Sequence, residues 1–378
     1  MMLSRNSAHF ANGRPDSWTV LDISHRSQNK CTRGTLNELR ATRVFQTDAG
    51  SWVVAPAKGS QPSKGIIHFL GGAFAGAAPQ IVYSLLLEIL ANDGYTVVST
   101  PYAITFRHLD CALAVKRQFV DSVEELRLSP SQADLVPSSA LCLGVGHSMG
   151  SLLHLLIGST NSDLPPTVAN ALMSYNNKQV SDAIPVPGLL DALAPAVQAA
   201  RTLPPNTFFG TPPKPSELLS TAASWLPPSL REVVDEGGRL TRAGLALEQL
   251  GTVVGEVGDG TTAFDPSPAE ARRMISRSYA VQKTMLVRFS DDGIDETPEV
   301  ETLLRGRFPG TGVQALLLPG THLTPCGGDI KLDLPPATAG GAVGAFSELL
   351  RVQAQVDVRR LGDRLVGFLN AQCAATIR

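Results

Sequence analysis

Short apolar runs alternate along the chain with longer stretches in which apolar residues recur every three or four positions. The short runs are typical of buried strands and the longer stretches of helices that pack on one side. We predict strands at residues 44–46, 51–56, 66–70, 95–100, 141–145, 169–175, 284–289 and 313–318, and helices at residues 79–91, 112–128, 299–305 and 341–371. This alternation predicts an α/β fold, with a mostly parallel sheet and helices on both faces.

Residues 176–283 break the alternation. They are rich in proline, contain helical stretches at residues 189–200 and 239–250, and include no convincing core strand. We therefore predict a helical cap inserted into a core formed by residues 43–175 and 284–378. The apolar side chains of the cap suit a lipophilic acyl or alkyl group, but packing of the cap onto the core explains any one of them equally well.

The strand predicted at residues 141–145 runs directly into the sequence GHSMG, residues 146–150, and an apolar helical stretch follows without a breaker. Strand, sharp turn and helix are the setting in which G-x-S-x-G forms a nucleophile elbow. The glycines let strand and helix pack closely, and the turn places Ser148 at a helix N-terminus, where the dipole favours negative charge. Ser148 is therefore the predicted nucleophile. The alternative is an ordinary glycine-rich turn that contains a serine.

A serine hydroxyl needs a histidine base, and the histidine is usually oriented by a carboxylate. Where a nucleophile elbow is used, the acid and then the histidine follow the serine along the chain. Only His154 and His322 come after Ser148. His154 lies on the helix of the elbow and points away from the serine oxygen, whereas His322 follows the last predicted strand. We predict His322 as the base.

The acid should come from the aspartates that follow the strand at residues 284–289. Asp292 is our first choice because of its offset from the strand, Asp295 is the alternative, and Asp291 is the third candidate. Asp182, after the preceding strand, is a remote fourth. An aspartate that is not the acid can cap the helix that follows.

Backbone N–H groups must also stabilise the charge that develops on the substrate oxygen. One should come from Met149, which follows the nucleophile, and the other from Ala73 or Phe74 in the glycine-rich loop after residues 66–70. A phosphate-binding loop is the competing interpretation. The loop lacks G-x-G-x-x-G and the lysine of a nucleotide site, so we expect no nucleotide there.

Composition narrows the classes of partner. The chain has 378 residues, a formal net charge of −2 and no basic footprint for nucleic acid. Its five cysteines are far apart, which fits a reduced compartment and predicts neither a disulfide framework nor a zinc site. We expect no cofactor and no metal. Apolar runs of membrane-spanning length are absent from the sequence, which leaves peripheral membrane contact open.

The first 42 residues are rich in arginine and serine, poor in acidic residues, and contain no apolar core of a secretory signal. This composition favours an organelle transit peptide. The alternative is an N-terminal extension of a cytoplasmic protein.

Several segments together resemble one family. They are residues 68–74 (HFLGGAF), 101–102 (PY), 146–150 (GHSMG), 174–177 (SYNN), 291–295 (DDGID) and 319–325 (PGTHLTP). The chain from about residue 52 onward resembles an α/β-hydrolase-like family of cyanobacteria and of plant and algal plastids, catalogued as a domain of unknown function. The resemblance implies an α/β-hydrolase fold and a plastid transit peptide, and it implies no substrate.

These observations predict a serine hydrolase that cleaves a carboxylic ester or thioester, with a lipophilic acyl substrate. An acyltransferase would use the same residues, Ser148, Asp292 and His322. A hydrolase-fold protein that only binds a ligand or a partner is the alternative from a different class.

Overall fold

The structure, a computed structural model, describes residues 42–73, 75–138, 140–160, 166–178, 256, 261, 263–310, 312–327 and 341–376. Side chains of the last helix are described from residue 352. The predicted transit peptide and most of the predicted cap lie outside these residues.

The core is one eight-stranded sheet with strand order β1-β2-β4-β3-β5-β6-β7-β8. Pairing of β1 with β2 and of β2 with β4 is antiparallel, and all pairs from β4 to β8 are parallel. The strands are β1 (Arg43–Gln46), β2 (Trp52–Ala55), β3 (Gly65–Leu70), β4 (Thr96–Ser99), β5 (Leu141–His147), β6 (Ala169–Met173), β7 (Lys283–Phe289) and β8 (Val313–Leu318). All eight predicted strands are present.

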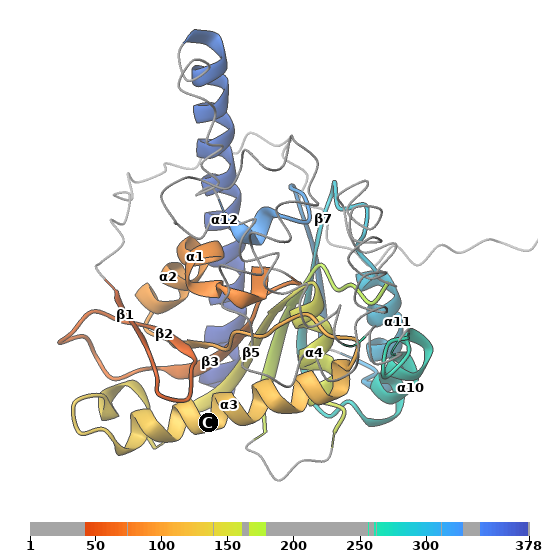
Figure 1. Cartoon of the computed structure of the whole chain (residues 1–378), viewed down its shortest axis with the longest axis horizontal. Coiled ribbons are helices and arrows are strands. Elements are labelled where there is room, and N and C mark those ends of the chain that lie inside the picture. The colour runs from red at the N-terminus through yellow and green to blue at the C-terminus, as the bar shows by residue number, and fades with distance from the viewer. Residues whose placement is uncertain are drawn as a thin grey trace, which may run out of the picture.

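Helices cover both faces of the sheet (Figure 1). One layer consists of α2 (Ser84–Asn92) and α12 (Gly341–Thr376), whose buried side chains share an apolar cluster with the sheet. The opposite layer consists of α3 (His108–Leu128), α4 (Met149–Ile157), α10 (Pro268–Ser278) and α11 (Thr297–Arg307), which share a second cluster. The strands lie between two apolar layers, which is why they read as nearly continuous apolar runs.

Several details differ from the sequence prediction. The helix expected at residues 79–91 is two helices, α1 (Pro79–Val82) and α2, separated at Tyr83, whose side chain is fully buried. Helix α3 begins at His108, four residues earlier than predicted. Helix α10 falls inside the range predicted for the cap, but it packs on α4 and α11 and therefore belongs to the core layer.

The connections between strands determine which loops meet at the carboxyl ends of the sheet. The helix that follows β3 lies on one face and the helix that follows β5 lies on the other, although these two strands are neighbours. A crevice opens at such a switch point, outside the carboxyl ends of the strands. The loop after β3 and the turn after β5 are therefore brought together there.

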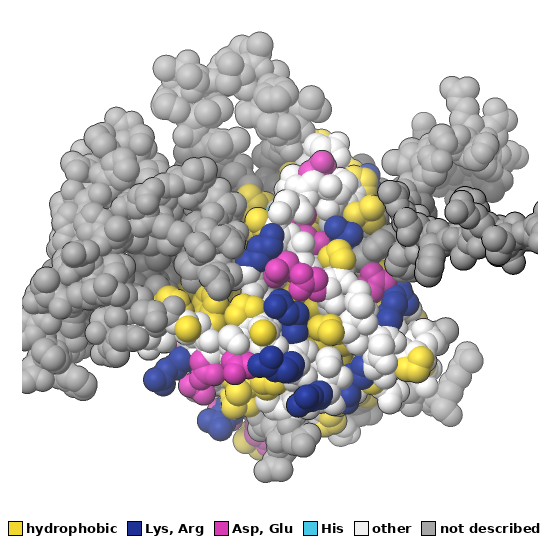
Figure 2. Space-filling view, turned by 90° about the vertical axis from the view of Figure 1, so that its right-hand side faces the viewer, with side chains coloured by type: hydrophobic (Ala, Val, Ile, Leu, Met, Phe, Trp, Pro, Cys, Tyr) yellow, Lys and Arg dark blue, Asp and Glu magenta, His cyan; other side chains and the backbone are white. Residues whose placement is uncertain are grey.

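The outer side of α10 and α11, on the right in Figure 1, faces the viewer in Figure 2. Basic and acidic side chains are interspersed on this face (Figure 2). Helices α10 and α11 are joined by an ion pair of Arg272 with Glu299 at 3.3 Å. Such a mixed surface is typical of a solvated helix layer. Within the described part of the chain, no helix is long and apolar enough to cross a bilayer.

Candidate active site

Ser148 lies in a strained turn between β5 and α4. Its backbone has φ 54° and ψ −119°, a conformation that a residue with a side chain rarely adopts. A Cβ on Gly146 would lie 2.7 Å from the carbonyl oxygen of Gly150, and a Cβ on Gly150 would overlap the carbonyl oxygen of Leu70. The two glycines of the motif are thus required by the close approach of β5, α4 and β3. The Ser148 N–H donates to the carbonyl of Met173 at 2.9 Å, which ties the turn to β6.

Ser148, His322 and Asp292 form one hydrogen-bonded row. The Nε2 atom of His322 lies 3.0 Å from Ser148 Oγ, and the Nδ1 atom lies 2.8 Å from Asp292 Oδ2. An ionised carboxylate can only accept, so Nδ1 carries the proton and Nε2 of the neutral ring accepts from the serine hydroxyl. The three side chains come from the ends of β5, β7 and β8, which meet at one edge of the sheet.

The Asp292 carboxylate is fully enclosed, with a side chain that is 0% exposed. Burial raises the pKa of this carboxyl. Hydrogen bonding and electrostatic interaction with His322, a contribution from Ser174, and the N–H of Ile294 outweigh that effect and lower the pKa below its usual value. Asp292 is therefore held in the ionised form that can orient an imidazole.

The other aspartates are engaged elsewhere. Asp295 Oδ2 pairs with Arg288 at 2.7 Å, and Asp295 Oδ1 accepts from the N–H of Thr297 at 3.1 Å and from its hydroxyl. Asp291 accepts from the Ser290 hydroxyl at an exposed site. Asp182 lies outside the described residues. The structure thus brings Asp292, and not Asp295 or Asp291, to His322.

The loop after β3 reaches the serine. A Cβ on Gly72 would be 3.2 Å from the Ser148 Cβ, so the loop backbone passes directly beside the nucleophile. The Gly72 N–H donates a hydrogen bond to the hydroxyl of Tyr83 at 2.8 Å. Among the described residues, the N–H groups of Ala73 and Met149 have no acceptor. Phe74 lies outside the described residues.

Three residues near the row have no role in the sequence prediction. Ser174, at the end of β6, is fully buried, has φ 47° and contributes to the low pKa of Asp292. Tyr83 and His147 lie beneath the serine, hydrogen-bonded to each other at 2.8 Å. His147 is the variable residue of G-x-S-x-G and Ser174 belongs to the segment SYNN, so both positions stand in motifs. Nothing in the sequence singles out Tyr83.

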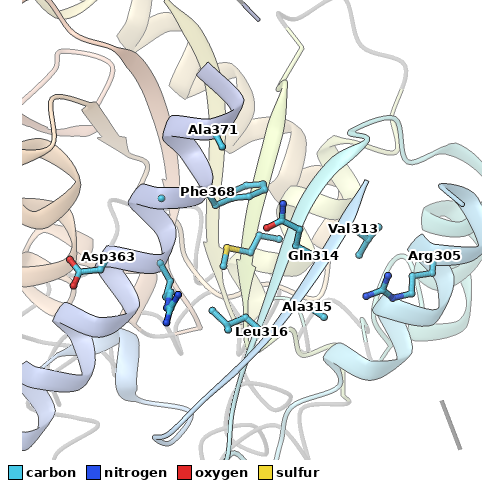
Figure 3. Close-up of a pocket in the computed structure, with 11 residues that line it drawn as sticks. Arg305, Val313, Gln314, Ala315, Leu316, Asp363, Phe368 and Ala371 are labelled. Atoms are coloured by element: carbon cyan, nitrogen blue, oxygen red, sulfur yellow. The ribbon is translucent and has the colours of Figure 1, made fainter. Parts of the chain in front are cut away.

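Two further features concern ligands. Within the described part of the chain, no group of three histidine, cysteine or acidic side chains is placed to hold a metal ion. A pocket of about 540 Å³ lies between the edge strand β8 and α12, lined among others by Arg305, Gln314 and Phe368 (Figure 3). Ser148, Asp292 and His322 do not line it, so it is separate from the row described above.

A mostly parallel sheet with a strained serine after β5, an acid after β7 and a histidine after β8 defines an α/β-hydrolase fold, as predicted. The chain belongs to the family described as "Protein of unknown function (DUF1350)", whose model matches residues 45–371. The resemblance noted in the sequence to a domain of unknown function is thereby confirmed.

Solved structures with similar folds have low identity to this chain. A hydrolase from Pseudomonas aeruginosa is 14% identical, with coverage of 83% of this chain and 99% of its own and a TM-score of 0.39. The peroxisomal alpha-beta-hydrolase Lpx1 from Saccharomyces cerevisiae is 15% identical, with coverage of 81% and 82% and a TM-score of 0.39. The esterase Pf2001 from Pyrococcus furiosus is 12% identical, with coverage of 88% and 92% and a TM-score of 0.41. No curated protein matches the chain.

Proposed function

We propose that this protein is a serine hydrolase that cleaves a carboxylic ester or thioester through an acyl-enzyme on Ser148. The observation that carries the proposal is the row of contacts from Ser148 Oγ to His322 Nε2 at 3.0 Å and from His322 Nδ1 to Asp292 at 2.8 Å. This geometry supplies a nucleophile, a general base and an orienting carboxylate within hydrogen-bond reach.

In the proposed reaction, Ser148 Oγ attacks the substrate carbonyl carbon while His322 Nε2 takes the hydroxyl proton. The imidazolium that forms is stabilised by the ionised Asp292. His322 then gives the proton to the leaving alcohol or thiol, which leaves an ester on Ser148. A water molecule repeats the sequence, with His322 as base, and releases the acid and the free serine.

The oxyanion of each tetrahedral intermediate would be bound by the N–H groups of Met149 and Ala73. Met149 is the first residue of α4, so the helix dipole adds to its hydrogen bond. Gly72 is excluded as a donor because its N–H is already bonded to Tyr83. Removing one such donor lowers turnover by about 100- to 1,000-fold in serine hydrolases.

We propose a lipophilic acyl group as the substrate. Leu323 follows His322 directly along the chain and is 54% exposed, so the loop that carries the base also presents an accessible apolar side chain. An apolar acyl chain would gain about 25 cal/mol for each Å² that it buries. A series of esters of increasing chain length tests this: kcat/KM should rise with length, and equal values for short and long chains would contradict it.

A fluorophosphonate probe tests the nucleophile, because it reacts only with an activated serine. The full chain should be labelled covalently at Ser148, and Ser148→Ala should not be labelled. Ser151→Ala is the matched control, since Ser151 lies one turn further along α4, is buried and bonds to Met173. A folded protein that is not labelled would support a ligand-binding protein instead. Turnover that needs an added alcohol rather than water would indicate an acyltransferase.

We also propose that residues 1–42 direct the protein to a plastid. Support comes from their arginine- and serine-rich composition and from the family match, which begins only at residue 45. A fluorescent protein fused behind residues 1–42 should enter plastids. A fusion in which the arginines of this segment are replaced by glutamate is the control. Cytoplasmic fluorescence of the unmodified fusion would contradict the proposal.

A further inference from the structure

A second hydrogen-bonded row lies next to the first. It contains none of the proposed triad side chains, although it ends on the backbone carbonyl of His322. The Gly72 N–H lies 2.8 Å from Tyr83 Oη, Tyr83 Oη lies 2.8 Å from His147 Nδ1, and His147 Nε2 lies 2.9 Å from the carbonyl oxygen of His322. The side chains of Tyr83 and His147 are buried, with residue exposures of 0% and 2%. Two side chains therefore connect the loop after β3, the elbow and the loop after β8.

The chemistry of the two ends determines the direction of every bond in this row. A backbone N–H can only donate, so Tyr83 Oη accepts from Gly72. A backbone carbonyl can only accept, so His147 Nε2 carries a proton and donates to His322. Burial lowers the pKa of His147 to about 3, so its ring is neutral and Nδ1 has no proton. The Tyr83 hydroxyl must then donate to Nδ1, and every polar atom of both side chains is satisfied.

The peptide between Gly71 and Gly72 is held from its other side as well. Its carbonyl oxygen, on Gly71, accepts from the hydroxyl of Tyr102, while its N–H donates to Tyr83. This peptide directly precedes the one that carries the Ala73 N–H, so the two tyrosines anchor the backbone just before that donor. The Gly72 carbonyl, which shares a peptide with the Ala73 N–H, accepts from the Gly76 N–H at 2.6 Å. Tight packing adds to the effect, because a Cβ on Gly72 would lie 3.2 Å from His147 Nδ1.

We propose that His147 and Tyr83 are positioning residues for acyl transfer. They join the Ala73 backbone, Ser148 and the His322 loop into one rigid unit, and they act through these groups without touching the substrate. The assignment rests on the proposed function. Reaction at Ser148 requires accurate placement of the base and of the oxyanion donor. Misplacement by about 1 Å can slow a reaction by about 100-fold.

Three variants separate positioning from packing. Tyr83→Phe keeps the ring and removes only the hydroxyl that joins Gly72 to His147. His147→Leu removes both nitrogens, and His147→Gln restores an amide N–H that can reach the His322 carbonyl. His68→Leu is the matched control, because His68 is equally buried but lies within β3, where its Nε2 contacts Thr100 at 3.2 Å.

The experiment measures covalent labelling of the full chain by a fluorophosphonate over a range of probe concentrations. This yields the maximal rate constant and the half-saturating concentration. Tyr83→Phe and His147→Leu should lower the maximal rate constant about 10- to 100-fold with little change in half-saturation. His147→Gln should recover most of the loss relative to His147→Leu, and His68→Leu should react like the wild type. Thermal unfolding checks that each variant is folded at the assay temperature.

Wild-type rates in Tyr83→Phe and His147→Leu would overturn the proposal and leave the row as packing only. So would a His147→Gln variant that is no faster than His147→Leu. Absence of labelling in the wild type would instead refute the proposed hydrolase, and the positioning role with it. If His147→Leu does not fold, Tyr83→Phe alone decides, since it removes a single oxygen atom.

Discussion

The two candidate acids, Asp292 and Asp295, should respond in opposite ways to the same substitution. Asp292→Asn replaces the carboxylate next to His322 Nδ1 by a group whose amide also donates. The ring then accepts on Nδ1 and carries its proton on Nε2, where it can no longer accept the proton of Ser148. Loss of the correct tautomer lowers turnover by about 10,000-fold in a serine protease with the same arrangement, which is about 5.5 kcal/mol of activation free energy.

Asp295→Asn should instead affect stability. The Asp295 side chain is 1% exposed and is paired with Arg288, whose side chain is 28% exposed. Breaking a fully buried ion pair costs about 3–5 kcal/mol. Solvent near Arg288 screens part of this interaction, and the asparagine oxygen can still accept from Thr297. We therefore expect a loss of about 1–3 kcal/mol in the free energy of unfolding.

Fluorophosphonate labelling and denaturant unfolding measured on the same two proteins test this pair. Asp292→Asn should fold normally and label at least about 1,000-fold more slowly than the wild type, because labelling, like turnover, needs His322 to accept the proton of Ser148. Asp295→Asn should label at a rate within the same order of magnitude as the wild type and unfold at lower denaturant. If Asp295→Asn is inactive while Asp292→Asn is active, the assignment of the acid is wrong.

Three further predictions concern stability. Gly150→Ala should destabilise the protein by about 3 kcal/mol or more, because its Cβ would overlap the Leu70 carbonyl oxygen. Gly367→Ala is the control: it lies in α12 with open space around it and should stabilise the protein by up to about 1 kcal/mol. Equal effects in denaturant unfolding would refute the steric argument. Burial lowers the pKa of His154 from 6.5 to about 3, so the unfolded state takes up a proton at higher pH than the folded state. The free energy of unfolding should therefore fall as pH drops below 6.5, by up to about 1.4 kcal/mol per pH unit. A pH series should show a shallower fall in His154→Leu, and an unchanged slope would contradict this. Lys116 is buried, its Nζ has no hydrogen-bond partner among the described residues, and burial lowers its pKa. Lys116→Met should therefore raise the free energy of unfolding by about 1–3 kcal/mol at pH 7 and by less as pH approaches 10. A lower unfolding free energy in Lys116→Met would show that the ammonium is stabilising.

Local patterns along the chain were sufficient for the architecture. Residues 66–70 and 141–145 are apolar on both sides because each strand lies between two helix layers, and this pattern needs no knowledge of neighbours. The glycines around Ser148 likewise report a local necessity, the close crossing of β5, α4 and β3. His322 could be predicted because only two histidines follow Ser148 and one of them lies on α4.

The tertiary structure was needed to show which aspartate contacts His322. Asp291, Asp292 and Asp295 are the same residue type within five positions, and local sequence makes each a reasonable helix cap or turn residue. Only the path of the loop after β7 brings Asp292 to His322 while Asp295 turns toward Arg288. The boundary at α10 has the same origin, because a helix that packs on α4 and α11 is no different in sequence from a helix of a cap.

The sequence by itself therefore determined the α/β-hydrolase fold, the strained turn at Ser148 and the candidate base, because each rests on a pattern within a few residues or on order along the chain. The sequence ranked Asp292 first by its offset from the strand, but only the tertiary structure shows which aspartate contacts His322, and it alone reveals the row through Tyr83 and His147. Tyr83 and His147 are 64 positions apart, and His322 is a further 175 positions along the chain. Hydrogen bonds between such positions depend on which strand ends meet at one edge of the sheet, and no local pattern records that.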